Sequence, residues 1–456
     1  MNLQTLLPAA TLTCFIAVSA TAGSNDKPSP AKPAAAVYTP RPVNTLTFTK
    51  DIAPIVWKNC AECHRAGEVG PFTLTSFQDV AKRTKTIASV IEKGTMPPWK
   101  AAPVQRYHDE RVLTAEQVGM FKQWAAEGAR EGNVSDLPPL PKFASGWKLG
   151  TPDLVLEMPE AYSIAAEGRD VYRNFVIPTR LTDDRWLAAV EVHPGNRSVV
   201  HHVIVHYDTS GQARELDARD PGPGYGRGGG GIGFRGSQIG GWAPGNDARL
   251  APAGVGRLLP KNADIVLQVH YNKSGKPETD RTKIGLHFVK GRVDQRWHTF
   301  PLVARLSIPA GDPDYVTRST IPVPTDSTLH SVMPHMHLVG REMKVSATLP
   351  DGREIPLVHV PKWDFNWQMT YAFADPVKLP RGSRIHMEAH YDNSTGNPNN
   401  PNNPPRPIRW GEQTNDEMCL AYLNFTHDGE SLTKGRKVDG VSDILRDLGE
   451  QFRKKK

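Results

Sequence analysis

From Trp147 to about residue 435 the chain consists of short β-branched or alternating runs separated by turn clusters. Such runs occur at 171–177, 199–205, 265–269 and 384–391, and their pattern is typical of strands. Helical periods are nearly absent over these roughly 290 residues, which is too long for one small sandwich. We therefore expect an all-β region of antiparallel, jelly-roll-like β-sandwiches.

A repeated string suggests that two related sandwiches stand in tandem. Residues 268–274 read QVHYNKS, and residues 388–394 read EAHYDNS. A repeated structural unit explains this similarity. We predict one sandwich over 147–300 and a second over 301–435, followed by a charged tail at 436–456.

The amino-terminal segment predicts export. Residues 1–22 are uncharged and mostly apolar, and they end in the small residues Ala20-Thr21-Ala22. A lipid anchor on Cys14 is the alternative, but Thr11 stands where a lipobox requires Leu. We expect a signal peptide at 1–22, a periplasmic or secreted protein, and a Pro/Ala/Ser-rich linker at 23–42.

Two of the cysteines stand in Cys60-Ala61-Glu62-Cys63-His64. This spacing is typical of a c-type haem attachment site, in which both thiols bind the haem covalently and His64 supplies the proximal nitrogen. A redox dithiol would need a βαβ setting, and a zinc half-site would need two further ligands nearby. Neither pattern is found, so the motif predicts one covalent haem c.

The surroundings predict a small all-α domain over 43–132 that resembles class I cytochromes c. Residues 114–129 form the clearest helix, capped by Thr114. The segment Gly94–Trp99 resembles the axial-ligand loop of that class, with Met96 as the sixth haem ligand and His108 as the rival.

Shorter signals flank this domain. Residues 48–56 predict a short helix that leads into the haem motif, with Thr49 or Asp51 as its cap. Residues 133–146 are rich in Pro and predict a second, stiffer linker.

Charge and hydropathy exclude two classes of partner. The 55 Lys+Arg against 48 Asp+Glu give a net charge of +7, part of which is local to the closing Arg453–Lys456. No basic cluster occurs in the body of the chain, so nucleic-acid binding is not expected. No run of eighteen apolar residues follows position 30, so no internal membrane span is expected.

Histidines stand at metal-ligand spacing inside the predicted strands. His201-His202 ends one β-branched run, His270 lies in another, and His335-Met336-His337 places two imidazoles on one strand face. Met418 offers a thioether, and imidazole combined with thioether favours copper because soft sulfur stabilises Cu(I). Each fragment alone is also compatible with ordinary surface or core histidines.

Taken together, residues 150–430 resemble the copper type II, ascorbate-dependent monooxygenases, the group of the peptidylglycine α-hydroxylating and dopamine β-monooxygenases. The strings that carry the resemblance, in the family's order, are His201-His202-Val203, Gly241-Trp242-Ala243-Pro244-Gly245, Leu267-Gln268-Val269-His270-Tyr271, His335-Met336-His337 and Asp416-Glu417-Met418-Cys419.

The resemblance implies two copper sites. His201, His202 and His270 bind the copper that holds an electron, and His335, His337 and Met418 bind the copper where O2 is activated. Adjacent His201 and His202 would point to opposite faces of a regular strand, so joint ligation needs a bulge or a strand end.

Two positions depart from the family pattern, and a third agrees with it. Cys419 lacks the disulfide partner that the family provides, and Met333 stands where peptide-amidating members have Arg. A glycine-extended peptide substrate is therefore not expected, although Tyr422 matches the family's substrate-facing Tyr. Among the other histidines, His390 is held in reserve as a ligand.

The expected function is that of an exported copper monooxygenase that hydroxylates an sp3 C–H of a small-molecule or peptide-like substrate with O2. The resemblance assigns catalysis to His335, His337, Met418 and Tyr422, with electrons supplied through the fused haem from an unidentified external donor. The alternative is a non-catalytic electron-transfer or copper-binding protein.

Overall fold

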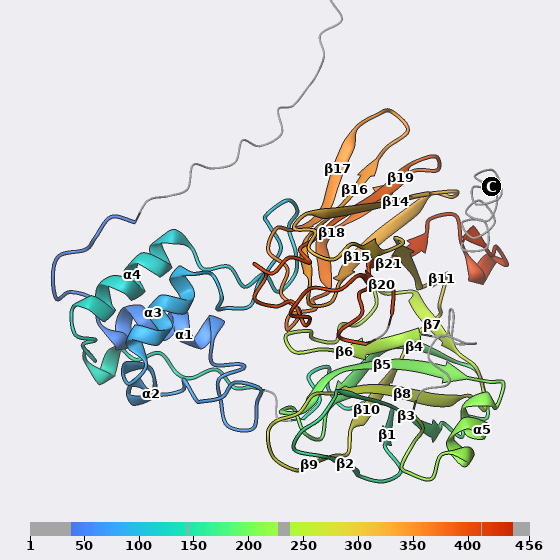
Figure 1. The fold of residues 1–456 in the computed structure, drawn as a ribbon, viewed down its shortest axis with the longest axis horizontal. Helices are drawn as coiled ribbons and strands as arrows, with labels where there is room; N and C mark the ends of the chain where they lie inside the picture. Colours follow the sequence, from blue (N-terminus) through green and yellow to red (C-terminus); the bar gives the residue numbers. More distant parts are fainter. Residues whose placement is uncertain (1–37, 144–145, 227–237, 412, 441–456) are drawn as a thin grey trace, which may run out of the picture.

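The computed structural model describes residues 38–143, 146–226, 238–411 and 413–440. A helical unit lies at one end of the molecule, and two β-sandwiches stand beside it (Figure 1). The predicted signal peptide at 1–22, Cys14, most of the 23–42 linker and most of the 436–456 tail lie outside the described residues. Within the described part, no helix is long and apolar enough to cross a membrane.

The helical unit is small, and four short helices do not by themselves establish a cytochrome c fold. Its core is aromatic: Phe48 packs against Trp57 and Trp124, with ring centroids 5.6 and 6.2 Å apart. The elements are η1 (Phe48–Ile52), α1 (Ala53–Asn59), α2 (Phe77–Ala81), α3 (Thr84–Glu92), α4 (Ala115–Ala126) and η2 (Val134–Asp136).

The helix caps were predicted with mixed success. Thr114 caps α4 as predicted, in a capping box with Gln117, and the helix ends at Ala126 rather than at residue 129. The cap of η1 was predicted wrongly: it is Thr47, whose hydroxyl accepts from the Lys50 N–H, while the Asp51 carboxylate accepts from the Thr47 N–H. Asp51 therefore stabilises the N-cap residue Thr47 through a hydrogen bond but is not itself the N-cap.

The first sandwich packs two sheets of strand order β1-β10-β4-β7-β11 and β3-β8-β5-β6, with a small β2-β9 pair at its rim. Its interior is aliphatic, and the central strand β8 is almost wholly buried. The elements are β1 (Leu154–Glu157), β2 (Tyr162–Ile164), β3 (Val171–Pro178), β4 (Arg185–His193), β5 (Val200–Asp208), α5 (Gln212–Arg219), β6 (Gln238–Trp242), β7 (Val255–Leu259), β8 (Asp264–Tyr271), β9 (Glu278–Asp280), β10 (Lys283–Phe288) and β11 (Gln295–Arg296).

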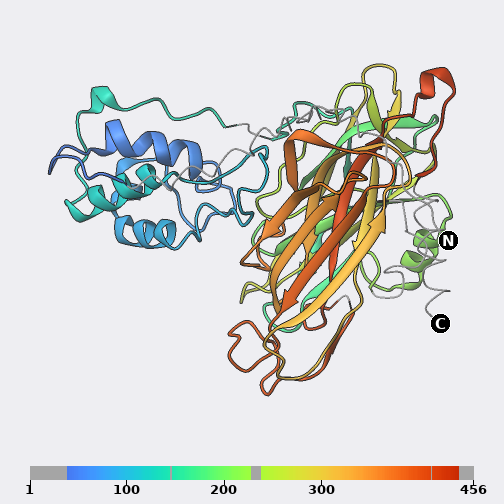
Figure 2. The same ribbon diagram turned by 90° about the horizontal axis from the view of Figure 1, so that it is seen from above.

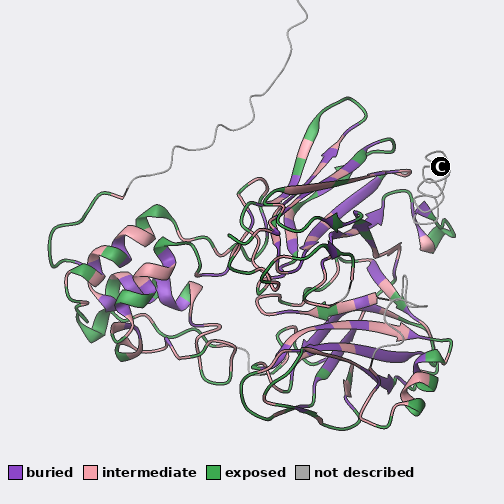
Figure 3. Ribbon diagram, in the orientation of Figure 1, coloured by how far each residue is buried: buried purple, intermediate pink, exposed green. Residues whose placement is uncertain are grey.

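The second sandwich packs the sheet β12-β21-β15-β18 against β14-β19-β16-β17, with a β13-β20 pair at its rim. Residues of β19 alternate between buried and partly exposed, as period-two sequence alternation requires (Figure 3). The elements are β12 (His298–Val303), β13 (Ser307–Ile308), β14 (Tyr315–Pro322), β15 (Ser327–His335), β16 (Gly340–Thr348), β17 (Glu354–Val360), β18 (Tyr371–Leu379), β19 (Arg384–Tyr391), β20 (Ile408–Arg409), β21 (Leu420–His427) and η3 (Leu432–Lys434).

The repeated string has equivalent places in the two sandwiches. The strands β8 and β19 each lie between two antiparallel neighbours in a four-stranded sheet. Tyr271 and Tyr391, which follow the repeated histidines, are both fully buried. The expectation of a mostly β chain built largely from antiparallel sheets is thereby confirmed.

A segment between α3 and α4 leaves the helical unit and packs on the second sandwich (Figure 2). Tyr107 is buried there, its ring lies 5.5 Å from that of Tyr371, and its hydroxyl donates to the Leu357 carbonyl at 2.9 Å. The Ala102 and His108 amides donate to carbonyls of the same sandwich, at 2.8 Å each. We call residues 99–111 the docking segment.

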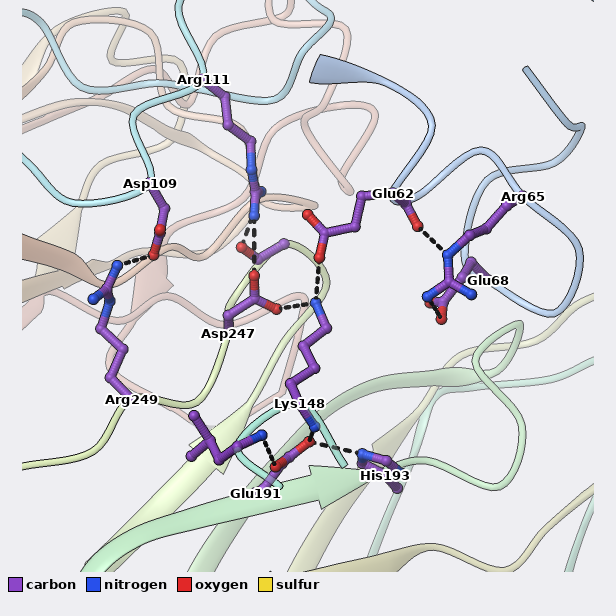
Figure 4. Close-up of polar contacts among 12 residues, drawn as sticks. Glu62, Arg65, Glu68, Asp109, Arg111, Lys148, Glu191, His193, Asp247 and Arg249 are labelled. Carbon is purple, nitrogen blue, oxygen red and sulfur yellow. Dashed lines mark hydrogen bonds and ion pairs between the residues drawn. The ribbon is translucent and has the colours of Figure 1, made fainter. Parts of the chain in front are cut away.

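Polar contacts join the helical unit to the first sandwich (Figure 4). The ammonium of Lys148 lies 2.7 Å from the carboxylate of Glu62, inside the predicted haem-attachment motif, and 2.6 Å from that of Asp247. Asp247 also pairs with Arg111 of the docking segment, at 3.5 Å. A cavity of about 270 Å³ adjoins this network, between Arg65 on the helical side and Trp242 on β6.

Candidate metal centre

Three histidines converge where β5 begins beside β8. His201, His202 and His270 each bring a ring nitrogen within 4.8 Å of the others. The β5–β8 ladder shifts register between Val200 and His202, so a bulge turns two adjacent imidazoles to one side. The bulge or strand end that joint ligation requires is therefore present.

The spacing of this cluster suits one metal ion. The Nδ1 atoms of His201 and His202 lie 3.2 Å apart. Two nitrogens that are each 2.0–2.1 Å from a shared ion, with an N–ion–N angle between 90° and the tetrahedral value, are separated by about 2.8–3.4 Å. Buried Nδ1 of His270, which faces this pair, has no hydrogen-bond partner among the described residues and is therefore free to bind an ion.

A carboxylate behind the cluster orients one ring. Asp170 accepts from Nε2 of His270 at 3.1 Å, which leaves Nδ1 to face the other histidines. The same carboxylate accepts from the hydroxyl of Thr414, which belongs to the second sandwich, at 3.1 Å. Tyr172 stacks on His270 with ring centroids 4.1 Å apart. Such outer contacts fix the tautomer and the orientation of a metal-binding imidazole.

The second group lies at the end of β15. Met336 points into the core, and His335 and His337 lie together on its other side, with ring centroids 5.2 Å apart. Strand β15 ends at His335, so the two imidazoles do not share one regular strand as predicted, and His337 lies just beyond it.

Hydrogen bonds select the free nitrogen of each ring in this pair. Nδ1 of His335 lies 2.8 Å from Oε1 of Gln368, and Nδ1 of His337 lies 3.1 Å from the Asp416 carbonyl. Both rings therefore keep Nε2 for a ligand. Met418 is half-buried, and its carbonyl accepts from the Tyr391 hydroxyl at 2.9 Å.

Burial keeps these imidazoles neutral, which is the form that binds metal. Desolvation lowers the pKa of His201 and of His337 to about 4 and that of His335 to about 3. The pKa of His202 is lowered well below its ordinary value, first by burial and then by the neighbouring histidines of both groups.

One aromatic ring contacts both groups. Phe365, in the loop between β17 and β18, stacks on His201 at 4.8 Å and meets His337 edge-on at 5.8 Å between ring centroids. The two histidine groups therefore face each other across a single side chain, at the junction of the two sandwiches.

His390 does not join either group. Its Nδ1 lies 3.0 Å from Asp314, its Nε2 lies 3.1 Å from Glu388, and these carboxylates raise its pKa. Both ring nitrogens are thus engaged, which removes the reason to hold it in reserve as a ligand.

The haem-motif residues are presented in a form that suits attachment. Cys60 and Cys63 are free thiols just after α1, and burial raises the pKa of Cys60 to about 12. Nδ1 of His64 lies 3.1 Å from the Phe72 carbonyl, so Nε2 remains for iron. Gly70 passes so close that a Cβ there would lie 2.8 Å from that Nδ1. Cysteine thiols beside an oriented imidazole are the donor set that haem c needs.

The two rival axial ligands differ in their surroundings. Met96 is half-buried after α3, next to the buried Pro97 and Pro98. His108 is exposed on the docking segment, where its amide donates to the Ala372 carbonyl. The thioether of Met96 is thus less exposed than the imidazole of His108.

Sequence reasoning missed several residues that shape the metal centre. Asp170, Gln368 and Phe365 lie outside regular strands, in segments without a recognisable motif. Only the polar position of Asp170, directly before a strand that neighbours β8, could have drawn attention.

A family model matches part of the chain. Residues 315–434, which are 120 of the 456, match the model described as copper type II ascorbate-dependent monooxygenase, C-terminal domain. The matched region contains His335, His337 and Met418, whereas His201 and the helical unit lie outside it. The match supports a copper-dependent monooxygenase, an oxidoreductase that uses O2 and a substrate. No curated protein matches the chain.

Solved structures align only loosely. The major capsid protein P2 of bacteriophage PM2 aligns at 8% identity and a TM-score of 0.24, over 60% of this chain and 97% of that one. The structure of PNGF-II aligns at 8% identity and a TM-score of 0.25, over 60% and 65% of the two chains. TM-scores this low do not establish a shared fold.

Proposed function

We propose that this protein is an exported copper monooxygenase that hydroxylates an sp3 C–H with O2. The observation that carries the proposal is the meeting of His201/His202/His270 with His335/His337 across Phe365. The proposed reaction inserts one oxygen atom of O2 into a C–H bond and reduces the other to water, which consumes two electrons and two protons.

The protein's own groups prepare two unlike copper sites. Copper, when bound, supplies the one-electron chemistry with O2 that amino-acid side chains lack. Three imidazoles hold one site, and Asp170 orients the His270 ring from behind. Two imidazoles and the thioether of Met418 hold the other, where the soft sulfur favours Cu(I). Tyr422 and Met333 lie opposite each other on β21 and β15, next to the second site.

We propose further that Cys60 and Cys63 carry a covalent haem c, with His64 and Met96 as axial ligands. A haem with Met and His ligands supplies electrons at a raised potential. The network of Lys148, Glu62 and Asp247 supports transfer to copper. It joins the haem motif to residues that follow β6, which pairs with the histidine-bearing strand β5.

The test combines metal counts with oxygen chemistry. The intact protein is expected to bind two coppers per chain and to consume O2 under reductant with formation of a hydroxylated product. His201→Ala should leave the site at Met418 loaded, and Met418→Ala should leave the three-histidine site loaded but abolish oxygen activation. His390→Ala is the matched control and should change neither.

Two results would contradict the proposal. Loss of both coppers from either single variant would show that the sites are not separate. Two bound coppers without O2-dependent product, across a broad substrate screen, would instead support a copper-binding protein. Each pre-reduced haem gives up one electron, so two haems should be oxidised per hydroxylation when no other donor is present.

A further inference from the structure

A positively charged side chain that has no counter-ion among the described residues lies between the two sandwiches. Arg257, in β7, is half-buried, and among the described residues no carboxylate forms an ion pair with it. Its guanidinium donates to the Gln238 carbonyl and, at 2.8 Å, to the hydroxyl of Thr299 on β12. The described residues thus supply partners for two of its five N–H groups.

The partly buried guanidinium destabilises the protein unless an anion pairs with it. Burial lowers the pKa of Arg257 to about 10, so the group remains charged at neutral pH. A charge that is partly removed from water without an ionic partner is disfavoured, because its lost hydration is only partly replaced. Planar donors in a fork are the geometry that binds a carboxylate through two hydrogen bonds.

Hydrogen bonds fix the guanidinium at one end of a sheet face. The hydroxyl of Thr299 accepts from Arg257 and donates to Asn424 at 2.6 Å, and the Asn424 amide donates to Ser331 at 2.9 Å. These three residues form one cross-strand row of β12, β21 and β15. Arg257 is therefore held against the face of the second sandwich that is turned away from its core.

The same face leads to the proposed oxygen site. The next row pairs Pro301 with Tyr422 and Met333, and the row after it contains His335. His335 lies four positions after Ser331, which corresponds to about 13 Å along a strand.

The surface between the two ends is mainly apolar. Between the two ends Pro301 is exposed and Met333 is half-buried, and Val303, which is 44% exposed, lies opposite Leu420 in the row of His335. An apolar chain can lie on these side chains with its anionic end at Arg257.

We propose that Arg257 binds the carboxylate of an amphiphilic substrate whose apolar chain extends along this face toward His335. The inference rests on the proposed monooxygenase function and assigns its substrate class: an aliphatic or aryl-aliphatic monocarboxylate. Met333 then packs on the apolar chain of the substrate, and Arg257 of the first sandwich binds the carboxylate.

The probes are octanoate, decanoate and dodecanoate, each paired with its primary amide, and binding to the copper-loaded full chain is measured by calorimetry. At least one carboxylate is expected to bind more tightly than its amide. Arg257→Gln should weaken that carboxylate about 10- to 100-fold, the value of a charge-assisted hydrogen-bonded pair. It should leave the amide within about twofold, and Arg257→Lys should restore part of the preference. Arg384→Gln, at an exposed position on β19, is the matched control and should change nothing.

The outcomes separate this inference from the function on which it rests. Absence of a carboxylate preference at all three lengths overturns the inference in the unaltered protein, whether or not the variants fold. If acid and amide are oxidised equally and Arg257→Gln has no effect, the carboxylate site is refuted and the monooxygenase stands. If the preference is found but no probe is oxidised in an O2-dependent way, the anion site stands and the monooxygenase proposal loses its support.

Discussion

The carboxylate behind the three-histidine group provides a quantitative test of the metal centre. Asp170→Asn removes a negative charge but keeps an oxygen that can accept from Nε2 of His270. An ion 2.0–2.1 Å beyond the far nitrogen of that ring lies about 7 Å from the carboxylate. Coulomb's law at an effective dielectric constant of about 20 then gives about 2 kcal/mol for Cu(I).

Solvent reduces this value. The Asp170 side chain is 30% exposed, so screening brings the expected loss to about 1–2 kcal/mol, or about 5- to 30-fold in Cu(I) affinity. That range agrees with the effect of other residues that support a metal ligand.

The assay is a competition titration of the reduced protein with a chromogenic Cu(I) chelator. The Met418→Ala background isolates the three-histidine site. Asp314→Asn is the matched control, because Asp314 lies 3.0 Å from a nitrogen of His390, outside the proposed sites. An affinity that stays within twofold in Asp170→Asn, or that falls equally in both variants, would refute the reasoning.

Three further predictions follow from other contacts. Tyr107→Ala should lower the free energy of unfolding by about 3–5 kcal/mol, whereas Tyr107→Phe, which loses only the hydrogen bond to a carbonyl, should cost about 1 kcal/mol in denaturant titrations. Burial lowers the pKa of His330 to about 4, so its contribution to stability is present above pH 6.5 and is lost as the pH falls from 6.5 to 4. His330→Gln should therefore reduce the slope of stability against pH in that window by up to about 1.4 kcal/mol per pH unit in the copper-free protein, and an unchanged slope would contradict this. Lys148→Met should slow haem-to-copper electron transfer in stopped-flow experiments while changing stability by less than about 1 kcal/mol, because its ion pairs with Glu62 and Asp247 are half-exposed. An unchanged transfer rate would separate that interface from electron delivery.

Local signals predicted the strands well. The run at 384–391 coincides with β19, and those at 171–177 and 265–269 lie inside β3 and β8. Alternation also predicted that His201 and His202 need an irregular backbone, and the bulge in β5 provides it. These features depend on residues close in sequence, where period and side-chain shape carry the information.

The rest depends on which distant segments meet. Nothing near Phe365 in the sequence indicates that its ring contacts both His201 and His337. The sequence also gives no indication that Arg257 lacks a counter-ion among the described residues, because a missing partner produces no motif. Thr47 was missed as a cap because Thr49, two residues later, is also a plausible cap by type, and only the backbone geometry distinguishes them.

The docking segment has a consequence for how the chain can be divided. The stretch 99–111 leaves the helices directly after Met96 and returns at α4, so a cut in the 133–146 linker would not separate the parts cleanly. A fragment starting at residue 147 would expose the rings of Tyr371 and Phe373 where Tyr107 now packs. A fragment that contains only the helical unit would carry the docking segment without the second sandwich on which it packs. The proposed haem ligand loop and the second sandwich are thereby joined mechanically, so a movement of one strains the other.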